Sequence, residues 1–249
     1  ITTGETTKQA VVDKALLPDV ALLDAQLTIG LPAHVTAATG IDALVHAIEA
    51  YTSNIKKNPY SDMLAKEAIT LLSRNINTAT FDGLNMAARQ AMLLGACLAG
   101  QAFANAPVAA VHALAYPLGG HFHIPHGLSN SLVLPHVLRF NATHCTDLYS
   151  ELGKLVLTDT LITNATNAQI CEHFIQYIEH LILSLDLPTS LHEMTITLAD
   201  LPTLASDAMQ QTRLLMNNPK PLTEQDALAI YQQAFHGLSH AAQQGNHQP

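Results

Sequence analysis

The fold is decided by residues 111–127, which read Val-His-Ala-Leu-Ala-Tyr-Pro-Leu-Gly-Gly-His-Phe-His-Ile-Pro-His-Gly. This stretch holds four histidines: His112, His121, His123 and His126. The apolar residues before the two glycines predict a helix that ends at the glycine pair, because glycine commonly follows the last helical turn. His126, directly after Pro125, opens a second apolar helix. Two helices joined by a short turn are therefore expected, with a histidine on each.

We expect His112 and His126 to bind one metal ion. His112 stands in mid-helix among alanine, valine and leucine, and a single histidine in such a place is usually a core residue. His126 stands at a helix N-terminus, where the positive end of the helix dipole disfavours a protonated imidazole. A neutral, metal-bound imidazole suits that position better.

The other ligands are expected far upstream, in residues 40–46, Gly-Ile-Asp-Ala-Leu-Val-His. Asp42 and His46 are four residues apart on a predicted helix, so both side chains lie on one face, one turn apart. Such a pair alone is more often a surface pair. Here the neighbours are Ala, Ile, Leu and Val, among which an unpaired carboxylate is costly and a cation offsets the cost.

Together these side chains supply one carboxylate and three imidazoles. That donor set suits a borderline divalent ion such as Fe²⁺ or Zn²⁺ and disfavours Ca²⁺ and Mg²⁺, which prefer oxygen ligands. The absence of a cysteine ligand excludes a Cys-rich structural zinc site.

Composition limits the remaining function classes. The 249 residues are 48% hydrophobic and 12% charged, and the abundance of Ala and Leu favours helices. A net charge of −9 with 11 scattered basic residues argues against nucleic acid as a partner. No apolar run reaches 18 residues, which argues against a membrane partner. No signal peptide is recognisable, and the three cysteines never stand in CxxC spacing, so we expect a cytoplasmic protein.

Helical periodicity dominates the chain from residue 31 onward. The predicted helices span about residues 32–51, 62–75, 84–106, 107–120, 127–139, 146–157, 168–185, 198–216 and 223–236. The helix at 84–106 is apolar enough to be buried on all sides, and Thr223 with Asp226 predicts a capping box.

The first 30 residues have a different character. The runs at 9–12 and 20–24 predict two strands of a sheet whose remainder lies outside this sequence. Because two strands cannot form an independent domain, and because the chain starts at Ile1, we expect a piece of a longer protein.

Two stretches resemble the signatures of the iron-containing (group III) alcohol dehydrogenase family. They are residues 40–51, Gly-Ile-Asp-Ala-Leu-Val-His-Ala-Ile-Glu-Ala-Tyr, and residues 112–127. The flanking residues 16–24, 31–40 and 134–141 are also similar. In that family an Asp and three His hold one metal ion. They match Asp42, His46, His112 and His126, with the fourteen-residue spacing of the last two kept.

The resemblance implies a mainly α fold. Residues 31–249 would form an all-helical bundle like the α-domain of dehydroquinate synthase. Residues 1–30 would be residual strands of an N-terminal α/β domain. In the family that domain carries a Gly-Gly-Gly-Ser loop for the cofactor pyrophosphate. This sequence has no such loop, so the main cofactor-binding residues are expected outside it.

The resemblance also implies an activity. Hydride would pass between a primary or secondary alcohol or aldehyde and NAD or NADP, with the alcohol oxygen bound to Fe²⁺ or Zn²⁺. The full-length parent is expected to be a homodimer. Without the nucleotide-binding domain, we expect this chain to have little or no dehydrogenase activity.

Two further residues are assigned from the family pattern. Many members have a histidine four residues after the third ligand, where this sequence has Tyr116. Tyr116 is expected either to donate or relay a proton or only to shape the pocket. Phe103 matches a position that lines the substrate pocket. The additional His121 and His123 are expected to be loop residues rather than ligands.

Three alternative readings stay open at this point. A glycerol-dehydrogenase-like zinc enzyme and a dehydroquinate-synthase-like lyase typically use three protein ligands, and His46 beside Asp42 argues against both. A helical interaction domain with incidental histidines predicts that the four side chains lie more than roughly 5 Å from any common point, since ligand distances are near 2 Å.

Overall fold

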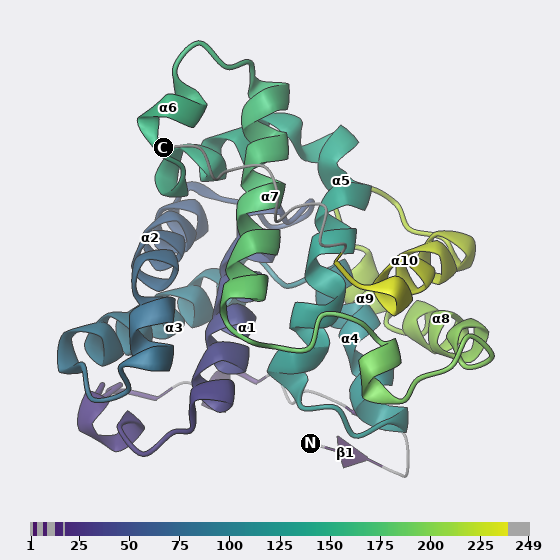
Figure 1. The fold of residues 1–249 in the computed structure, drawn as a ribbon, viewed down its shortest axis with the longest axis horizontal. Helices are drawn as coiled ribbons and strands as arrows, with labels where there is room; N and C mark the ends of the chain where they lie inside the picture. The colour runs from purple at the N-terminus through teal and green to yellow at the C-terminus, as the bar shows by residue number, and fades with distance from the viewer. Residues whose placement is uncertain (1, 4–6, 9–12, 17, 239–249) are drawn as a thin grey trace.

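The computed structural model describes residues 2–3, 7–8, 13–16 and 18–238, and this part of the chain is mainly helical (Figure 1). The mainly α fold expected from the sequence is confirmed. The α-helices are α1 (Ala33–Thr52), α2 (Pro59–Phe81), α3 (Met86–Asn105), α4 (Ala110–His121), α5 (His126–Val156), α6 (Asp159–Ile162), α7 (Asn167–Ser184), α8 (Leu201–Met209), α9 (Thr212–Leu215) and α10 (Glu224–His236). Short 3₁₀ turns span Lys14–Leu16, Ala25–Thr28 and His192–Met194.

Helices α1 and α5 form the centre of the molecule. α1 contacts α2, α3 and α5, while α5 also contacts α4, α7 and α10. In Figure 1, α2 and α3 lie to one side of this centre and α8, α9 and α10 lie to the other. Fully buried side chains such as Ile41, Leu44 and Ile48 place α1 in the core. The candidate site residues on α1, α4 and α5 therefore stand on elements fixed by packing.

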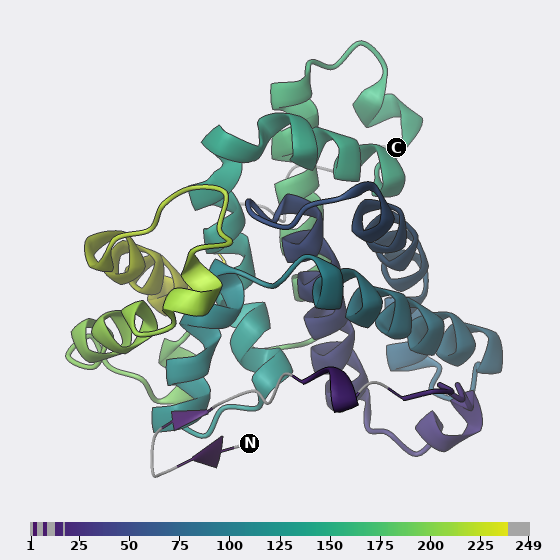
Figure 2. The ribbon, with the colours of Figure 1, turned by 180° about the vertical axis from the view of Figure 1, so that it is seen from behind.

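The segment before α1 runs along the helical body. Strands β1 (Thr2–Thr3) and β2 (Thr7–Lys8) pair antiparallel, with Thr2 opposite Lys8. β2 contacts α4, and the 3₁₀ turn Ala25–Thr28 contacts α3. Figure 2 shows these described pieces at the same end of the molecule, below α4 and α3.

Side-chain caps define several helix starts. Asn58 and Ser61 form a capping box at α2, and Thr166 and Gln169 form one at α7. The box predicted at α10 is confirmed, because Thr223 and Asp226 cap each other's backbone N–H groups. α4 differs, because its N-cap residue Ala109 has no side-chain cap of its own.

The two central helices approach each other closely at one glycine. A Cβ atom on Gly127 would lie 2.4 Å from the carbonyl oxygen of Ala38, which is nearer than any side-chain carbon can stand. Only glycine therefore lets the first turn of α5 rest on α1 at this point. The contact is one residue from His126 and four residues from Asp42.

Several sequence expectations about element limits were wrong. The helices predicted at 127–139 and 146–157 are one continuous helix, α5, with Pro135 in its interior. Buried residues continue along it at helical spacing, including Leu138, Cys145 and Leu152, so packing outweighs the hydrogen bond that Pro135 removes. The helix predicted at 198–216 is two helices, α8 and α9.

The other corrections concern exposure and strands. α3 is buried on one face only, because Leu94 is 43% exposed while Ala99 is fully buried. Residues 20–24 form no strand and are exposed, since they find no neighbouring strand among the described residues. The strand predicted at 9–12 lies outside the described residues.

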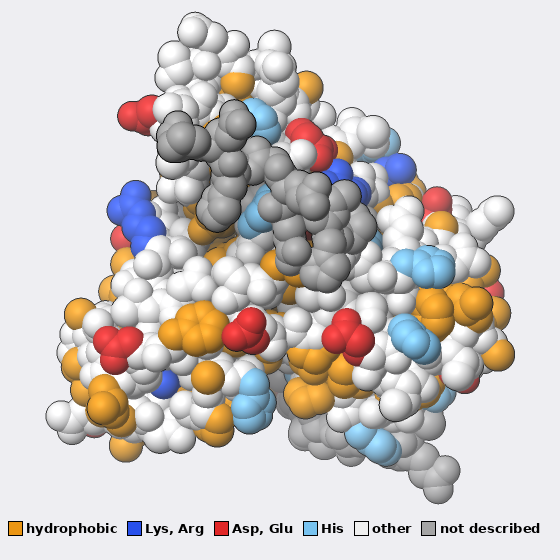
Figure 3. Space-filling view, viewed as in Figure 1, with side chains coloured by type: hydrophobic (Ala, Val, Ile, Leu, Met, Phe, Trp, Pro, Cys, Tyr) orange, Lys and Arg blue, Asp and Glu red, His pale blue; other side chains and the backbone are white. Residues whose placement is uncertain are grey.

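No single described helix is both long and apolar enough to cross a membrane, and the pair α3–α4, which passes that test together, is bent by 107°. On the face shown in Figure 3, the Lys and Arg side chains are few and form no continuous patch.

Candidate metal centre

Four side chains from three helices converge beside the middle of α1. Asp42 and His46 come from α1, His112 from α4, and His126 from the first residue of α5. One possible ligand atom from each lies within 4.8 Å of all the others. The Oδ1 atom of Asp42 is 3.9 Å from Nε2 of His46, 3.7 Å from Nε2 of His112 and 3.6 Å from Nε2 of His126.

These separations fit a single cation. Ligands about 2.0–2.2 Å from an ion in tetrahedral geometry stand roughly 3.3–3.6 Å apart, so the observed spacing needs only a small contraction. The rings of His46 and His112 stack with centroids 4.7 Å apart, which aligns both Nε2 atoms toward the same space. A helical interaction domain with incidental histidines does not account for such convergence.

The cluster is buried on one side and open on the other. The His112 side chain is 3% exposed, Asp42 is 17% and His126 is 38% exposed. Burial, and then the charge of His112, lower the pKa of His46 to about 4. His46 is therefore neutral at physiological pH, the form in which an imidazole binds a metal.

Glu49 orients His112. Its buried carboxylate accepts hydrogen bonds from the backbone N–H groups of Ala109 (2.9 Å) and Val111 (2.6 Å), and it lies 2.7 Å from Nδ1 of His112. An ionised carboxylate only accepts hydrogen bonds, so Nδ1 carries the proton and the Nε2 lone pair points at Asp42. The same carboxylate caps the N-terminus of α4, where a negative charge is favoured.

Sequence reasoning missed Glu49, although a signal was present. Glu49 follows Asp42 by seven residues and His46 by three, a spacing that places all three on one helix face. A carboxylate beside a ligating histidine is a common way to fix its tautomer.

Asn130 was also missed. It follows His126 by four residues on α5, so both side chains lie on the same face. Its Nδ2 atom is 2.5 Å from Oδ1 of Asp42 and 3.3 Å from Nε2 of both His112 and His126. The side-chain amide therefore touches three of the four candidate ligands.

Phe103 and Tyr116 both lie beside the cluster. The Phe103 ring stacks on His46 with centroids 4.6 Å apart. The centroids of the Tyr116 and His126 rings are 6.0 Å apart. Burial, and then the charges of Glu49 and Asp42, raise the pKa of the Tyr116 phenol, so it keeps its proton at neutral pH.

The two additional histidines of residues 111–127 stand apart from the four-residue cluster. His121 ends α4, and its Nε2 atom lies 2.5 Å from Oδ2 of Asp207 on α8. His123 is exposed in the turn, with a backbone φ of 55°. Among the described residues, neither belongs to a group of side chains close enough together to share one metal ion.

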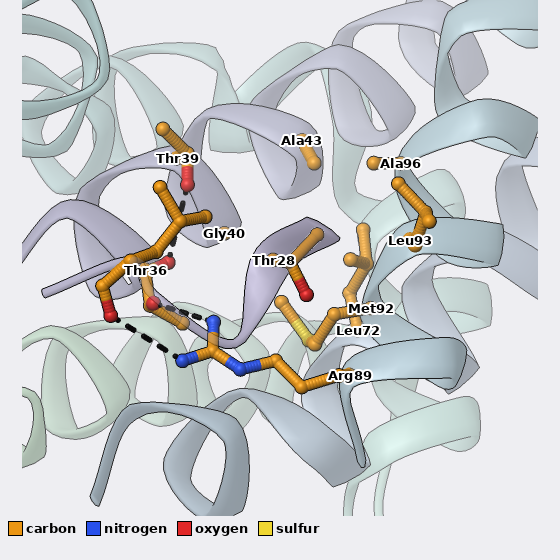
Figure 4. A pocket seen from close by; sticks show the side chains of 11 residues that line it. Thr28, Thr36, Thr39, Gly40, Ala43, Leu72, Arg89, Met92, Leu93 and Ala96 are labelled. Carbon is orange, nitrogen blue, oxygen red and sulfur yellow. Dashed lines mark hydrogen bonds between the residues drawn. The ribbon is translucent and has the colours of Figure 1, made fainter. Parts of the chain in front are cut away.

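A separate cavity of about 140 Å³ lies between α1, α2 and α3 (Figure 4). It is mostly apolar, and none of the four candidate ligands lines it. The buried guanidinium of Arg89 at its edge donates to Oγ1 of Thr36 (2.7 Å) and to the carbonyls of Gly83 (3.0 Å) and Leu31 (3.4 Å). Arg89 therefore ties the segment before α1 to the loop between α2 and α3.

Comparisons with known proteins show which family this chain resembles in sequence and in structure. Residues 36–235 match the model of the Fe-containing alcohol dehydrogenase family, C-terminal part. Long-chain-alcohol dehydrogenase 1 of Geobacillus thermodenitrificans is 45% identical over 237 residues, which is 94% of this chain and 58% of that protein. The 1,3-propanediol dehydrogenase of Klebsiella pneumoniae is 38% identical over 228 residues, 92% of this chain and 58% of that protein.

Solved structures agree with the sequence matches. A crystal structure of 1,3-propanediol oxidoreductase superposes with a TM-score of 0.82 at 38% identity, covering 85% of this chain and 55% of that one. An alcohol dehydrogenase from Oenococcus oeni superposes with a TM-score of 0.80 at 31% identity, covering 85% and 54%. This chain thus spans somewhat more than half the length of the proteins that it matches.

Proposed function

Because this chain belongs to the Fe-containing alcohol dehydrogenase family, we propose that it forms the metal-binding half of an enzyme that interconverts alcohols and aldehydes with NAD or NADP. The observation that carries the proposal is the convergence of four donor atoms within 4.8 Å. The relatives named above are called long-chain-alcohol and 1,3-propanediol dehydrogenases, which supports a primary alcohol as the substrate.

Asp42, His46, His112 and His126 would hold one divalent ion, Fe²⁺ or Zn²⁺. When bound, that ion supplies a Lewis acid that lowers the pKa of an alcohol hydroxyl and polarises an aldehyde carbonyl. Asp42 contributes the negative charge that offsets part of the ion's charge. Glu49 keeps His112 in the tautomer whose lone pair faces the site.

The neighbouring aromatic residues would shape the substrate side of the site. Phe103 covers His46 and offers an apolar surface to the carbon chain of an alcohol. Tyr116 keeps its proton at neutral pH and stands next to His126. We assign it the role of positioning substrate or holding a proton beside the reacting oxygen.

We further propose that residues 1–30 are a remnant of the cofactor domain of the parent enzyme and that residues 31–249 are its metal-binding domain. This division is supported by the length of the relatives, because the chain matches only 58% of each of the two dehydrogenases named above. Hydride transfer needs both halves, because substrate and nicotinamide must meet in one desolvated cleft. The chain alone should therefore bind metal without oxidising alcohols.

Metal analysis of the purified chain tests the proposal. After anaerobic reconstitution with Fe²⁺, or with Zn²⁺ in air, we expect about one ion per chain. His46→Ala should weaken binding strongly, whereas the matched His121→Ala should leave it unchanged. Unchanged binding by His46→Ala would favour the three-ligand relatives. NAD(P)-dependent oxidation of 1,3-propanediol by this chain alone would contradict the division into halves.

A further inference from the structure

The side chain of Asn130 occupies an unusual position for a buried amide. It is fully buried, and its Nδ2 atom lies within 3.3 Å of a carboxylate oxygen and two imidazole nitrogens that belong to three different helices. Its Oδ1 atom, in contrast, is buried without a hydrogen-bond partner among the described residues. The amide is therefore oriented by the cluster and not by the surroundings of its own oxygen.

The chemistry of the acceptors requires this orientation. The Asp42 carboxylate can only accept a hydrogen bond, and 2.5 Å is a distance at which it needs a donor. Turning the amide around would place an oxygen against the carboxylate and against two imidazole lone pairs. A buried acceptor without a partner costs free energy. Asn130 Oδ1 is left in that state, while Nδ2 faces the candidate ligands.

The hydrogen bonds from Asn130 to the two histidines and to Asp42 differ in whether they can persist once a cation is bound. An imidazole Nε2 atom has a single lone pair, so it cannot accept from Asn130 and bind a cation at once. A carboxylate oxygen has room for both interactions. Loading the site therefore frees Asn130 from His112 and His126 but leaves it bonded to Asp42.

We propose that Asn130 is a positioning residue for the metal centre, and this inference rests on the proposed metal-binding function. Its amide gathers Asp42, His112 and His126 into their binding arrangement before the cation arrives. The two N–H groups separate lone pairs that would otherwise repel one another. After loading, the remaining bond to Asp42 fixes the direction of the carboxylate.

Substitution by leucine tests the proposal, because Asn130→Leu removes both donors at a similar side-chain volume. Zn²⁺ titrations against a competing chelator should show a 10- to 100-fold higher Kd, the usual cost of losing a residue that orients a metal ligand. The matched control is Asn141→Leu. Asn141 is a buried amide on the same helix, roughly 16 Å further along its axis, and it is bonded to Asn218.

The two variants separate positioning from stability. Asn141→Leu should lower the thermal midpoint of the metal-free chain without changing the Kd for Zn²⁺. If Asn130→Leu behaves in the same way, Asn130 is a structural amide only and the inference is wrong. If the unchanged chain binds no Zn²⁺, the proposed metal centre itself fails.

A second substitution covers the case in which Asn130→Leu does not fold. Asn130→Ser keeps one donor, but its shorter side chain cannot span three acceptors, so we expect at least a roughly tenfold rise in Kd. Far-UV circular dichroism checks that the variant is folded. A folded serine variant with the original Kd would overturn the inference.

Discussion

Glu49 shows at the level of one residue how a buried charge is kept in this chain. It is 4% exposed, and no Lys or Arg of the described residues forms an ion pair with it; its carboxylate instead accepts hydrogen bonds from two backbone N–H groups and from the imidazole of His112. Hydrogen bonds to an ionised group are stronger than neutral ones. The residue therefore stabilises the start of α4 and orients a candidate ligand at the same time.

Replacing Glu49 by glutamine should affect both roles. One amide oxygen and one NH₂ group cannot accept from three donors, so we expect the metal-free chain to lose about 1–3 kcal/mol of stability. We also expect the Kd for Zn²⁺ to rise 10- to 100-fold. Urea unfolding with chelator and a Zn²⁺ titration measure the two effects.

Glu179→Gln is the control for that substitution. Glu179 is also buried, but it pairs with Arg139 between α5 and α7. The control should lower stability without changing Zn²⁺ affinity. A Glu49→Gln variant that loses stability yet binds Zn²⁺ like the original chain would show that Glu49 is a helix cap and nothing more.

His136 predicts how stability depends on pH. Burial, and then the charge of Arg139, lower its pKa to about 4, whereas a histidine in the unfolded chain titrates near 6.5. The unfolded state therefore binds a proton first as pH falls. The stability associated with neutral His136 is complete above pH 6.5 and is lost progressively between pH 6.5 and 4.

His136→Leu should make the metal-free chain less sensitive to acid. Between pH 6 and 5 the slope of unfolding free energy against pH should fall by up to about 1.4 kcal/mol per pH unit. Urea unfolding at half-unit pH intervals measures the slope. Equal slopes for both proteins would mean that His136 titrates alike in the folded and unfolded states.

At the level of elements, the site depends on how closely α1 and α5 approach. Gly127→Ala would place a Cβ atom 2.4 Å from a backbone oxygen of α1, and backbone cannot yield as a side chain can. We expect a loss of several kcal/mol of stability, in the range of strongly overpacked sites, together with weaker Zn²⁺ binding, because His126 moves away from Asp42.

Gly100→Ala is the matched control for Gly127→Ala. Gly100 lies in the interior of α3, and a Cβ atom there meets nothing within 4 Å. Alanine should stabilise the helix by roughly 0.5–1 kcal/mol. Thermal unfolding of both variants makes the comparison, and a stable Gly127→Ala variant with full Zn²⁺ affinity would contradict the close approach.

The elements also show what local sequence can predict. The capping box at the start of α10, formed by Thr223 and Asp226, could be predicted from local sequence. The continuity of α5 through Pro135 could not, because it depends on neighbours that α5 meets only in the folded chain. The exposed face of α3 was missed for the same reason, since an apolar helix does not reveal which side lacks a neighbour.

In the whole molecule, a bound ion would join α1, α4 and α5. A ligand that binds the folded state but not the unfolded state stabilises the folded state. Zn²⁺ at 100 times its Kd should therefore add about 2.7 kcal/mol to the free energy of unfolding. For a chain of this length that corresponds to a rise of roughly 5–10 °C in Tm. Differential scanning fluorimetry with Zn²⁺ and with chelator tests this. The rise should vanish in His112→Ala, and an equal rise there would place the ion elsewhere.

The four candidate ligands could be chosen from sequence because two compact signatures contain them. Glu49 and Asn130 were missed, although their spacing from His46 and His126 places each on the same helix face as a ligand. Their roles depend on which helix faces meet, and periodicity within one helix does not report that. The strand expected at residues 20–24 is absent for a related reason, since a strand needs a neighbour to pair with.

The uneven exposure of the cluster has a kinetic consequence. His112 is enclosed and anchored through its second ring nitrogen, while His126 is the most exposed of the four and begins its helix directly after a turn. An ion would reach the site past His126 and would leave after that imidazole detaches first. Changes in the turn at residues 122–125 should therefore alter how fast metal exchanges more than how tightly it is held.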